Sequence, residues 1–166
     1  MASINNVQIK SLKTFKGREG LCSQGNIYLN GKKLGFWSQD SHGAICDDFD
    51  FDESLLDQAA KNIFETEDDW KLYGVESFLY KLLILMDYEK IYKKIAKKGY
   101  KSMLLVSDGF HISYYMYPEK TGLIKEHVEE LKKGMFKRET PKVVIFHSLD
   151  DFNIIIDKEH PMPEWL

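Results

Sequence analysis

The period of the hydrophobic pattern changes twice along these 166 residues, and this feature limits the fold more than any other. Over residues 7–15 apolar and polar side chains alternate, as in a strand that buries one face. Between residues 53 and 98 apolar side chains recur at spacings of three and four, which predicts two helices, the longer one over 68–98. From residue 100 the alternation returns around one further helical pattern. The sequence therefore predicts an α+β protein whose strands form mainly antiparallel hairpins.

Two turn dipeptides locate the expected hairpins. Asn30-Gly31 and Asp108-Gly109 each stand between two strand-like runs, and a type I′ turn requires a positive φ at both of its central residues. Nothing in the chain is typical of a long linker, so we expect a single domain, 1–166. The expected parts are an N-terminal three-stranded antiparallel meander within residues 1–52, a helical pair within 53–99 and a ββαββ antiparallel sheet unit within 100–166, whose last two strands cover 142–147 and 152–156.

The composition is that of an ordinary soluble protein. Lys and Arg number 23 against 26 Asp and Glu, a net charge of −3, and 43% of the residues are hydrophobic. The longest apolar run, centred on residues 82–86, is far shorter than the ~20 residues that a membrane span needs. The first residues lack the basic stretch and apolar core of a secretion signal, so we expect a cytoplasmic location. Cys22 and Cys46 form no Cys-x-x-Cys pair, and no cofactor is expected.

Charge is strongly segregated along the sequence. The acidic segment, residues 40–69, holds eleven acids against Lys61 alone, a net charge of −10, whereas residues 7–36 and 71–101 each carry +5. Such a patch attracts a partner of opposite charge, although a solvated acidic face explains the same residues. Exposed carboxylates repel phosphate, so direct nucleic-acid binding is not expected at this segment and would fall to the lysine-rich end of the long helix. The expected binding surface for a protein partner comprises Asp47, Asp48, Asp50, Asp52 and Glu53.

A metal site is a second interpretation of the acidic segment. Asp48, Asp50 and Asp52 stand at alternating positions, and carboxylate oxygens are the ligands that calcium and magnesium prefer. A helix-loop-helix calcium site also needs a glycine at its sixth position and a glutamate at its twelfth, which this segment lacks. Phe49 and Phe51 between the acids favour instead a strand with both rings turned inward and the acids turned outward.

Two histidines are candidates for acid–base catalysis. His42 could act as a general base oriented by Asp40 or Asp47, although a turn stabilised by the Asp40 and Ser41 side chains explains the same residues. His111-Ile112-Ser113 resembles half of the paired His-x-Ser/Thr signature of two-histidine phosphoesterases. The second half would be His147-Ser148-Leu149, where a leucine replaces the hydroxyl residue.

Three short motifs near the N-terminus carry a resemblance to known proteins. They are Gly17-Arg18-Glu19-Gly20, Tyr28-Leu29-Asn30-Gly31-Lys32-Lys33 and Asp40-Ser41-His42-Gly43. With them, residues 7–50 resemble a group of small phage- and prophage-encoded proteins of unknown function, although Ala44 departs from the second glycine of their Asp-x-His-Gly-Gly segment. The resemblance implies a mobile-element origin and no particular activity.

Charge pattern and resemblance together lead to one functional expectation and two alternatives. We expect a small, soluble, phage-related binding protein that acts through its acidic segment on a protein partner, such as a host nuclease or a defence protein. The first alternative is a metal-assisted or histidine-based phosphoester hydrolase. The second is a self-associating module, a homo-oligomer in which oppositely charged segments pair between protomers.

Overall fold

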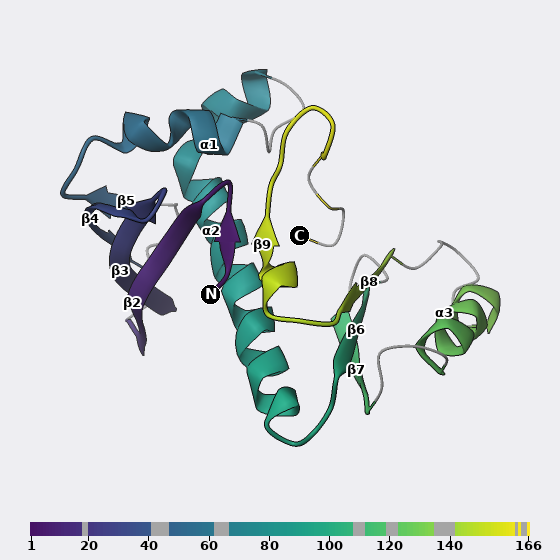
Figure 1. Ribbon diagram of the computed structural model, residues 1–166. Helices are drawn as coiled ribbons and strands as arrows, with labels where there is room; N and C mark the ends of the chain where they lie inside the picture. Colours follow the sequence, from purple (N-terminus) through teal and green to yellow (C-terminus); the bar gives the residue numbers. More distant parts are fainter. Residues whose placement is uncertain are drawn as a thin grey trace. The chain divides into compact units, whose positions relative to one another are not determined.

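The computed structural model describes residues 1–17, 20–40, 47–61, 67–107, 112–118, 123–134, 142–161, 163 and 166. It confirms the α+β class: three α-helices accompany a six-stranded and a three-stranded sheet in the described parts of the chain (Figure 1). The chain divides into two compact units. The first comprises residues 1–86 and 153–162, and the second comprises 87–152 and 163–166.

The first unit contains the six-stranded sheet. Its strands are β1 (Ser3–Ile4), β2 (Val7–Lys16), β3 (Leu21–Leu29), β4 (Lys32–Gln39), β5 (Asp47–Phe49) and β9 (Asn153–Ile154). Their order in space is β5-β4-β3-β2-β1-β9. All neighbouring pairs are antiparallel except β9, which lies parallel to β1 at the edge of the sheet.

Two tight turns of the same kind close hairpins of this sheet. At Asn30-Gly31 the φ angles are 51° and 79°, positive at both residues as the Asn-Gly pair predicts. Asn5-Asn6 joins β1 to β2 with φ angles of 49° and 63°. The main-chain N of Asn30 donates a hydrogen bond of 3.1 Å to the carbonyl O of Asn6, so the two turns lie side by side. Our predictions missed the second turn, although asparagine tolerates the left-handed region better than most residues.

Two β-bulges interrupt the register of the sheet. On β2, Ser11, with φ at 55°, and Leu12 together stand opposite Gly25 of β3. A Cβ atom at Gly25 would lie 2.6 Å from Cγ2 of Ile9, so glycine allows the close approach of β2 and β3 here. On β4, Leu34 is the extra residue of the second bulge. Each bulge changes which side chains of its strand share a face.

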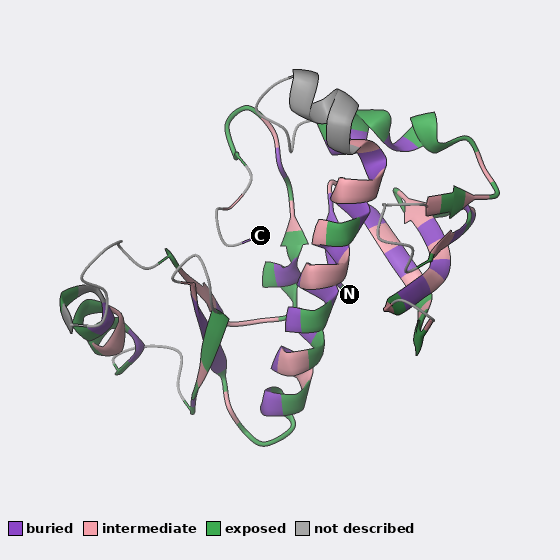
Figure 2. Cartoon of the chain, turned by 180° about the vertical axis from the view of Figure 1, so that it is seen from behind, coloured by how far each residue is buried: buried purple, intermediate pink, exposed green. Residues whose placement is uncertain are grey.

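Helical segments supply the rest of the first unit's core. They are the 3₁₀ turn η1 (Glu53–Leu56), the short helix α1 (Asp57–Lys61) and the long helix α2 (Glu67–Ala96), whose residues to Met86 belong to this unit. Figure 2 shows buried positions on sheet and helix alike. The fully buried apolar side chains of the unit include Ile4, Val7, Ile9, Ile27, Trp37, Leu56, Ala60, Phe78, Leu79 and Leu82. No helix of the described ranges is long and apolar enough to cross a membrane.

Helix α2 is interrupted at Gly74. Its φ and ψ angles are 48° and −151°, a conformation that belongs almost exclusively to glycine. An alanine in this conformation costs about 1–3 kcal/mol of backbone strain. Its higher helix propensity, about 1 kcal/mol, offsets only part of that cost. We therefore expect Gly74→Ala to lower the free energy of unfolding by about 1 kcal/mol in urea denaturation. Ser77→Ala, one turn further along α2, is the matched control and should change it by less than about 0.5 kcal/mol; an equal effect of both would contradict the prediction.

The second unit packs a helix on the three-stranded sheet. Strands β6 (Ser102–Ser107), β7 (Ile112–Tyr117) and β8 (Lys142–Phe146) form an antiparallel sheet in the order β7-β6-β8. Helix α3 (Leu123–Gly134) buries Ile124 and Leu131 against Leu104 and Val106 of β6 and Tyr117 of β7. Elsewhere in this unit Phe152, in the 3₁₀ turn η2 (Asp150–Phe152), stacks on Phe146 with ring centroids 4.3 Å apart.

The predicted pairing of the last strand in the ββαββ unit is wrong. We expected residues 142–147 and 152–156 to pair with each other, but β8 lies in the three-stranded sheet and β9 in the six-stranded one. Between them the Asp151 carboxylate accepts hydrogen bonds from the main-chain N atoms of His147, at 2.5 Å, and Ser148, at 3.0 Å. This side chain holds the chain in a 3₁₀ turn instead of a hairpin, which directs the following residues to β1.

Candidate functional site

The structure describes the acidic segment over residues 47–61, where it runs through β5, η1 and α1. Within these residues Lys61 is the only base. The exposed carboxylates are those of Asp48, Asp50, Asp52, Glu53 and Asp57, and we call these five residues the acidic surface. Among the described residues, no basic side chain forms a salt bridge with any of the five. Within the described residues, their charge is therefore left to solvent or to a partner.

Two carboxylates of the acidic surface also shape the backbone. Oδ1 of Asp50 accepts a hydrogen bond of 2.5 Å from the main-chain N of Phe36, while the main-chain N of Asp50 donates to the carbonyl O of Phe36 at 3.1 Å. Asp52 is the N-cap of η1, because its Oδ1 accepts from the main-chain N of Ser54 at 3.1 Å. The side chain and the main-chain N–H of Ser54 lower the pKa of Asp52 and keep it ionised. Both carboxylates are thus held in place at the surface.

Asp47 differs from the acidic surface because it is half-buried. Its Oδ2 accepts a hydrogen bond of 2.7 Å from Nε1 of Trp37, a side chain that is 1% exposed. Its Oδ1 is buried and has no hydrogen-bond partner in the described parts of the chain. The pKa of Asp47 is raised from 3.8 to about 6. Burial is the largest cause; the Trp37 hydrogen bond opposes it, and the nearby carboxylates of Glu76, Glu53 and Asp48 add to it. Sequence analysis assigned Asp47 to the binding surface, whereas the structure places it under that surface.

The described residues bring together no group of three or more His, Cys, Asp or Glu side chains that could hold a metal ion. Asp48, Asp50 and Asp52 accordingly form no such group, and two of them are engaged by main-chain N–H groups instead. Phe49 and Phe51 are half-buried and contact each other edge to face, with ring centroids 5.3 Å apart. This arrangement places the rings inward and the three aspartates outward along the chain.

The catalytic candidates are mostly beyond the described residues. Asp40 is exposed and directly follows β4, while His42, His111 and Cys46 lie outside the described ranges. Their roles stay predictions.

Two other histidines have partners inside the second unit. Nδ1 of His147 lies 2.8 Å from Oγ of Ser102, which is fully buried and therefore out of reach of a substrate. Nδ1 of His127 contacts the hydroxyl of Tyr117, and its ring meets Tyr115 edge to face at 4.6 Å. Both contacts join separate elements of the sheet and helix, so we assign them a structural role.

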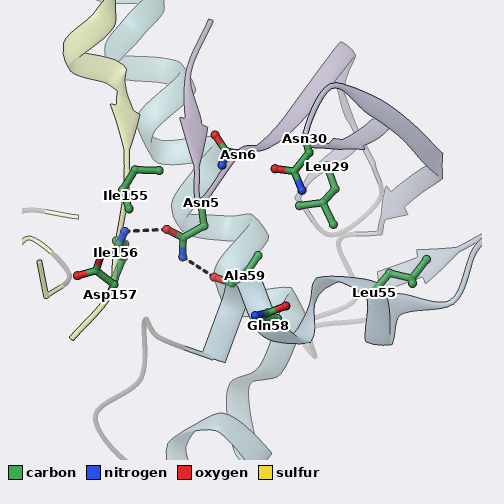
Figure 3. Close-up of a pocket in the computed structure, with 10 residues that line it drawn as sticks. All are labelled: Asn5, Asn6, Leu29, Asn30, Leu55, Gln58, Ala59, Ile155, Ile156 and Asp157. Atoms are coloured by element: carbon green, nitrogen blue, oxygen red, sulfur yellow. Dashed lines mark hydrogen bonds between the residues drawn. The ribbon is translucent and has the colours of Figure 1, made fainter. Parts of the chain in front are cut away.

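A polar hollow of about 300 Å³ lies between the two type I′ turns, the η1–α1 segment and the chain that follows β9 (Figure 3). Its floor depends on Asn5. Nδ2 of Asn5 donates to the carbonyl O of Ala59 at 2.7 Å, and Oδ1 of Asn5 accepts from the main-chain N of Ile156 at 2.7 Å. This carboxamide therefore links three segments that are far apart in the sequence.

The side chains around this hollow are neutral amides, aliphatic groups and one carboxylate. Asn6, Asn30 and Gln58 supply hydrogen-bond donors and acceptors, and Leu55 and Ile155 are half exposed, at 50% and 51%. Oδ1 of Asp157 accepts from the main-chain N atoms of Glu159 and His160, and the His160 hydrogen bonds lower the pKa of Asp157. The described lining contains no basic side chain, so the hollow suits a neutral polar group better than an anion.

The comparisons with known proteins give no relative for this chain: no family model matches it, and neither does any curated protein or solved structure.

Proposed function

We propose that this chain is a small binding protein whose acidic surface engages the positively charged groove of a nucleic-acid-binding protein. The observation that carries the proposal is the exposure of Asp48, Asp50, Asp52, Glu53 and Asp57 within ten consecutive residues, with no salt bridge to a described basic side chain. A dense array of carboxylates imitates the charge of a phosphate backbone and attracts a basic partner over a long range.

The rigidity of the surface supports the same function. The main-chain N–H groups of Phe36 and Ser54 hold the carboxylates of Asp50 and Asp52, so less side-chain entropy is lost when these groups are bound. The motifs shared with phage-encoded proteins make a host nuclease or defence protein the first candidate for the partner. Such a partner would lose access to its own nucleic acid while it is bound.

Capture from a bacterial lysate freed of nucleic acid tests this function, with heparin as the eluent because it competes for basic grooves. The test variant is Asp48→Lys/Glu53→Lys/Asp57→Lys, which spares Asp50 and Asp52 and hence the backbone contacts. We expect wild type to retain a basic protein and the triple variant to bind the purified partner at least about tenfold more weakly. Calorimetry on the purified pair gives the two dissociation constants.

Glu126→Lys/Glu130→Lys/Glu159→Lys is the matched control, because it reverses three exposed acids elsewhere and has the same net charge. It should retain the partner as wild type does. Equal binding by wild type and the test triple variant, or no protein retained above empty resin, would contradict the proposed function.

A further inference from the structure

The six-stranded sheet has an outer face, opposite the buried side chains of Ile9, Ile27 and Trp37. In an antiparallel sheet, residues directly opposite each other project to the same face. On β3, Tyr28, Asn26 and Gln24 alternate with the core residues and therefore lie on the outer face, and Cys22, although only 7% exposed, continues the same alternation. Their partners on β2 and β4 share it. The outer face thus carries Lys10, Lys13, Phe15, Tyr28, Lys33 and Phe36, and Asp48, which stands opposite Ser38, lies at its β5 edge.

The two bulges are what gather these side chains. Lys10 and Lys13 are three residues apart, so in a regular strand they would project to opposite faces. The bulge at Ser11 inserts one residue, and Lys10 and Lys13 oppose Asn26 and Gln24 on one face. The bulge at Leu34 does the same for Lys33 and Phe36 of β4, which oppose Tyr28 and Asn26. Two independent irregularities therefore bring lysines and an aromatic ring onto one face.

The aromatic rings of the outer face are accessible. Phe15 is 50% exposed and Phe36 is 37% exposed, although the same sheet buries other large side chains almost completely on its inner face. Nζ of Lys10 lies 4.1 Å from the centre of the Tyr28 ring, so that ring already binds a cation. Phe15 and Phe36 are the two rings of this face that are exposed enough for a planar group to stack on them.

The charged residues of β2, β3 and β4 are all of one sign. Over β2, β3 and β4 the sequence has five lysines, Lys10, Lys13, Lys16, Lys32 and Lys33, and no acid. Acids begin only on the next strand, where Asp48 of β5 pairs with Ser38 of β4. A polyanion that also exposes flat rings matches both properties, whereas a duplex hides its bases and an acidic peptide offers few rings.

We propose that the outer face binds single-stranded nucleic acid, with bases stacked on Phe15 and Phe36 and phosphates against Lys10, Lys13 and Lys33. Phe36 and Phe15 are two strands apart and four residues apart along β3, which places them roughly 17 Å from each other by strand geometry. A few nucleotides of extended single strand cover that span. The lysines and phenylalanines of this site are not residues of the acidic surface, which adjoins it at Asp48 and Asp50, so each proposal can fail alone.

Fluorescence anisotropy with fluorescein-labelled dT15 and U15 tests this binding at 50 and 200 mM NaCl. We expect both oligonucleotides to bind wild type, and the dT15·dA15 duplex to bind at least about fivefold more weakly. Phe15→Ala and Phe36→Ala should each weaken binding about tenfold, and Phe36→Tyr should restore it to within about threefold. Lys13→Gln/Lys33→Gln should reduce the slope of log Kd against log[NaCl] by roughly 1.4.

Matched controls separate this face from the rest of the chain. Lys97→Gln/Lys98→Gln removes two exposed lysines at the end of α2, and Leu123→Ala removes an apolar side chain that is 52% exposed. Both should bind dT15 as wild type does. The acidic-surface triple variant should bind dT15 at least as tightly as wild type, because it replaces negative charges with positive ones.

Three results would overturn the proposal: no binding of either oligonucleotide at 50 mM NaCl, equal binding by wild type and both phenylalanine variants, or equal affinity for a 15-residue polyglutamate peptide. Loss of binding in the Lys97/Lys98 variant would instead assign the site to the end of α2. Thermal unfolding of each variant checks that the exposed substitutions leave the fold intact.

Discussion

Replacing Asn5 with glycine is expected to lower the free energy of unfolding by about 2–4 kcal/mol. Glycine adopts the φ of 49° without strain, so the fall in the free energy of unfolding reports mainly on the lost hydrogen bonds of the Asn5 side chain. Without the carboxamide, the main-chain N of Ile156 and the carbonyl O of Ala59 each lose the hydrogen bond to Asn5, and both residues are buried, at 1% and 9% exposed. Urea denaturation of the variant measures the difference.

Asn6→Gly is the matched control, since Asn6 occupies the same turn, has φ at 63° and exposes its side chain. It should change the free energy of unfolding by less than about 0.5 kcal/mol. Asn5→Asp adds a second check. It keeps the acceptor for Ile156 but places a carboxylate oxygen against the carbonyl O of Ala59, so it should destabilise as well. Equal effects of Asn5→Gly and Asn6→Gly would contradict the role of this carboxamide.

Asp47→Asn is expected to stabilise the protein at pH 7.5 and to leave it unchanged at pH 4. The folded state raises the pKa of Asp47 from 3.8 to about 6, so it favours the protonated carboxyl. The preference of the folded state for the protonated carboxyl stabilises the protein. This stabilisation is fully present below pH 3.8 and is lost as the pH rises through about 6. The shift corresponds to at most about 3 kcal/mol, and solvent screening of a half-buried group reduces it to about 1–2 kcal/mol.

Asparagine removes this dependence because it is neutral at every pH and its Oδ1 can still accept the hydrogen bond from Nε1 of Trp37. The measurement is the difference in free energy of unfolding between Asp47→Asn and wild type at pH 4, 5.5 and 7.5. It should grow from zero to about 1–2 kcal/mol over that range. Asp57→Asn, which removes an exposed carboxylate of the acidic surface, should show no such growth. A difference that does not change with pH would show that Asp47 is not the titrating group.

Local signals predicted local structure well. The period of three and four over residues 68–98 corresponds to α2 at Glu67–Ala96, and Asn30-Gly31 forms the turn that its residue types favour. Both depend on neighbours within a few residues, which the sequence shows directly. The partner of the last strand depends instead on residues about 150 positions away, and alternation alone carries no information about it.

The same limit applies to the candidate site. The sequence groups Asp47 with the exposed acids, but the register of β5 on β4 places it beside Trp37, where burial changes its chemistry. One signal was available in the sequence. Alternate residues of a strand share a face, so Asp47 lies on the same inward face as Phe49 and Phe51. Asp48, Asp50 and Asp52 lie on the opposite face. The outer face could not be predicted from alternation at all, because two bulges decide which lysines lie beside which rings.

The parallel pairing of β1 with β9 also sets the order in which the protein can be completed during synthesis. Ser3 and Ile4 leave the ribosome early, yet their partners Asn153 and Ile154 are added about 150 residues later. The second unit, which is nearly continuous in the chain, can form its sheet and helix while the nascent first unit still lacks its edge strand. The sheet of the first unit therefore closes after that of the second, and a chain that stops before residue 153 leaves the edge of β1 unpaired.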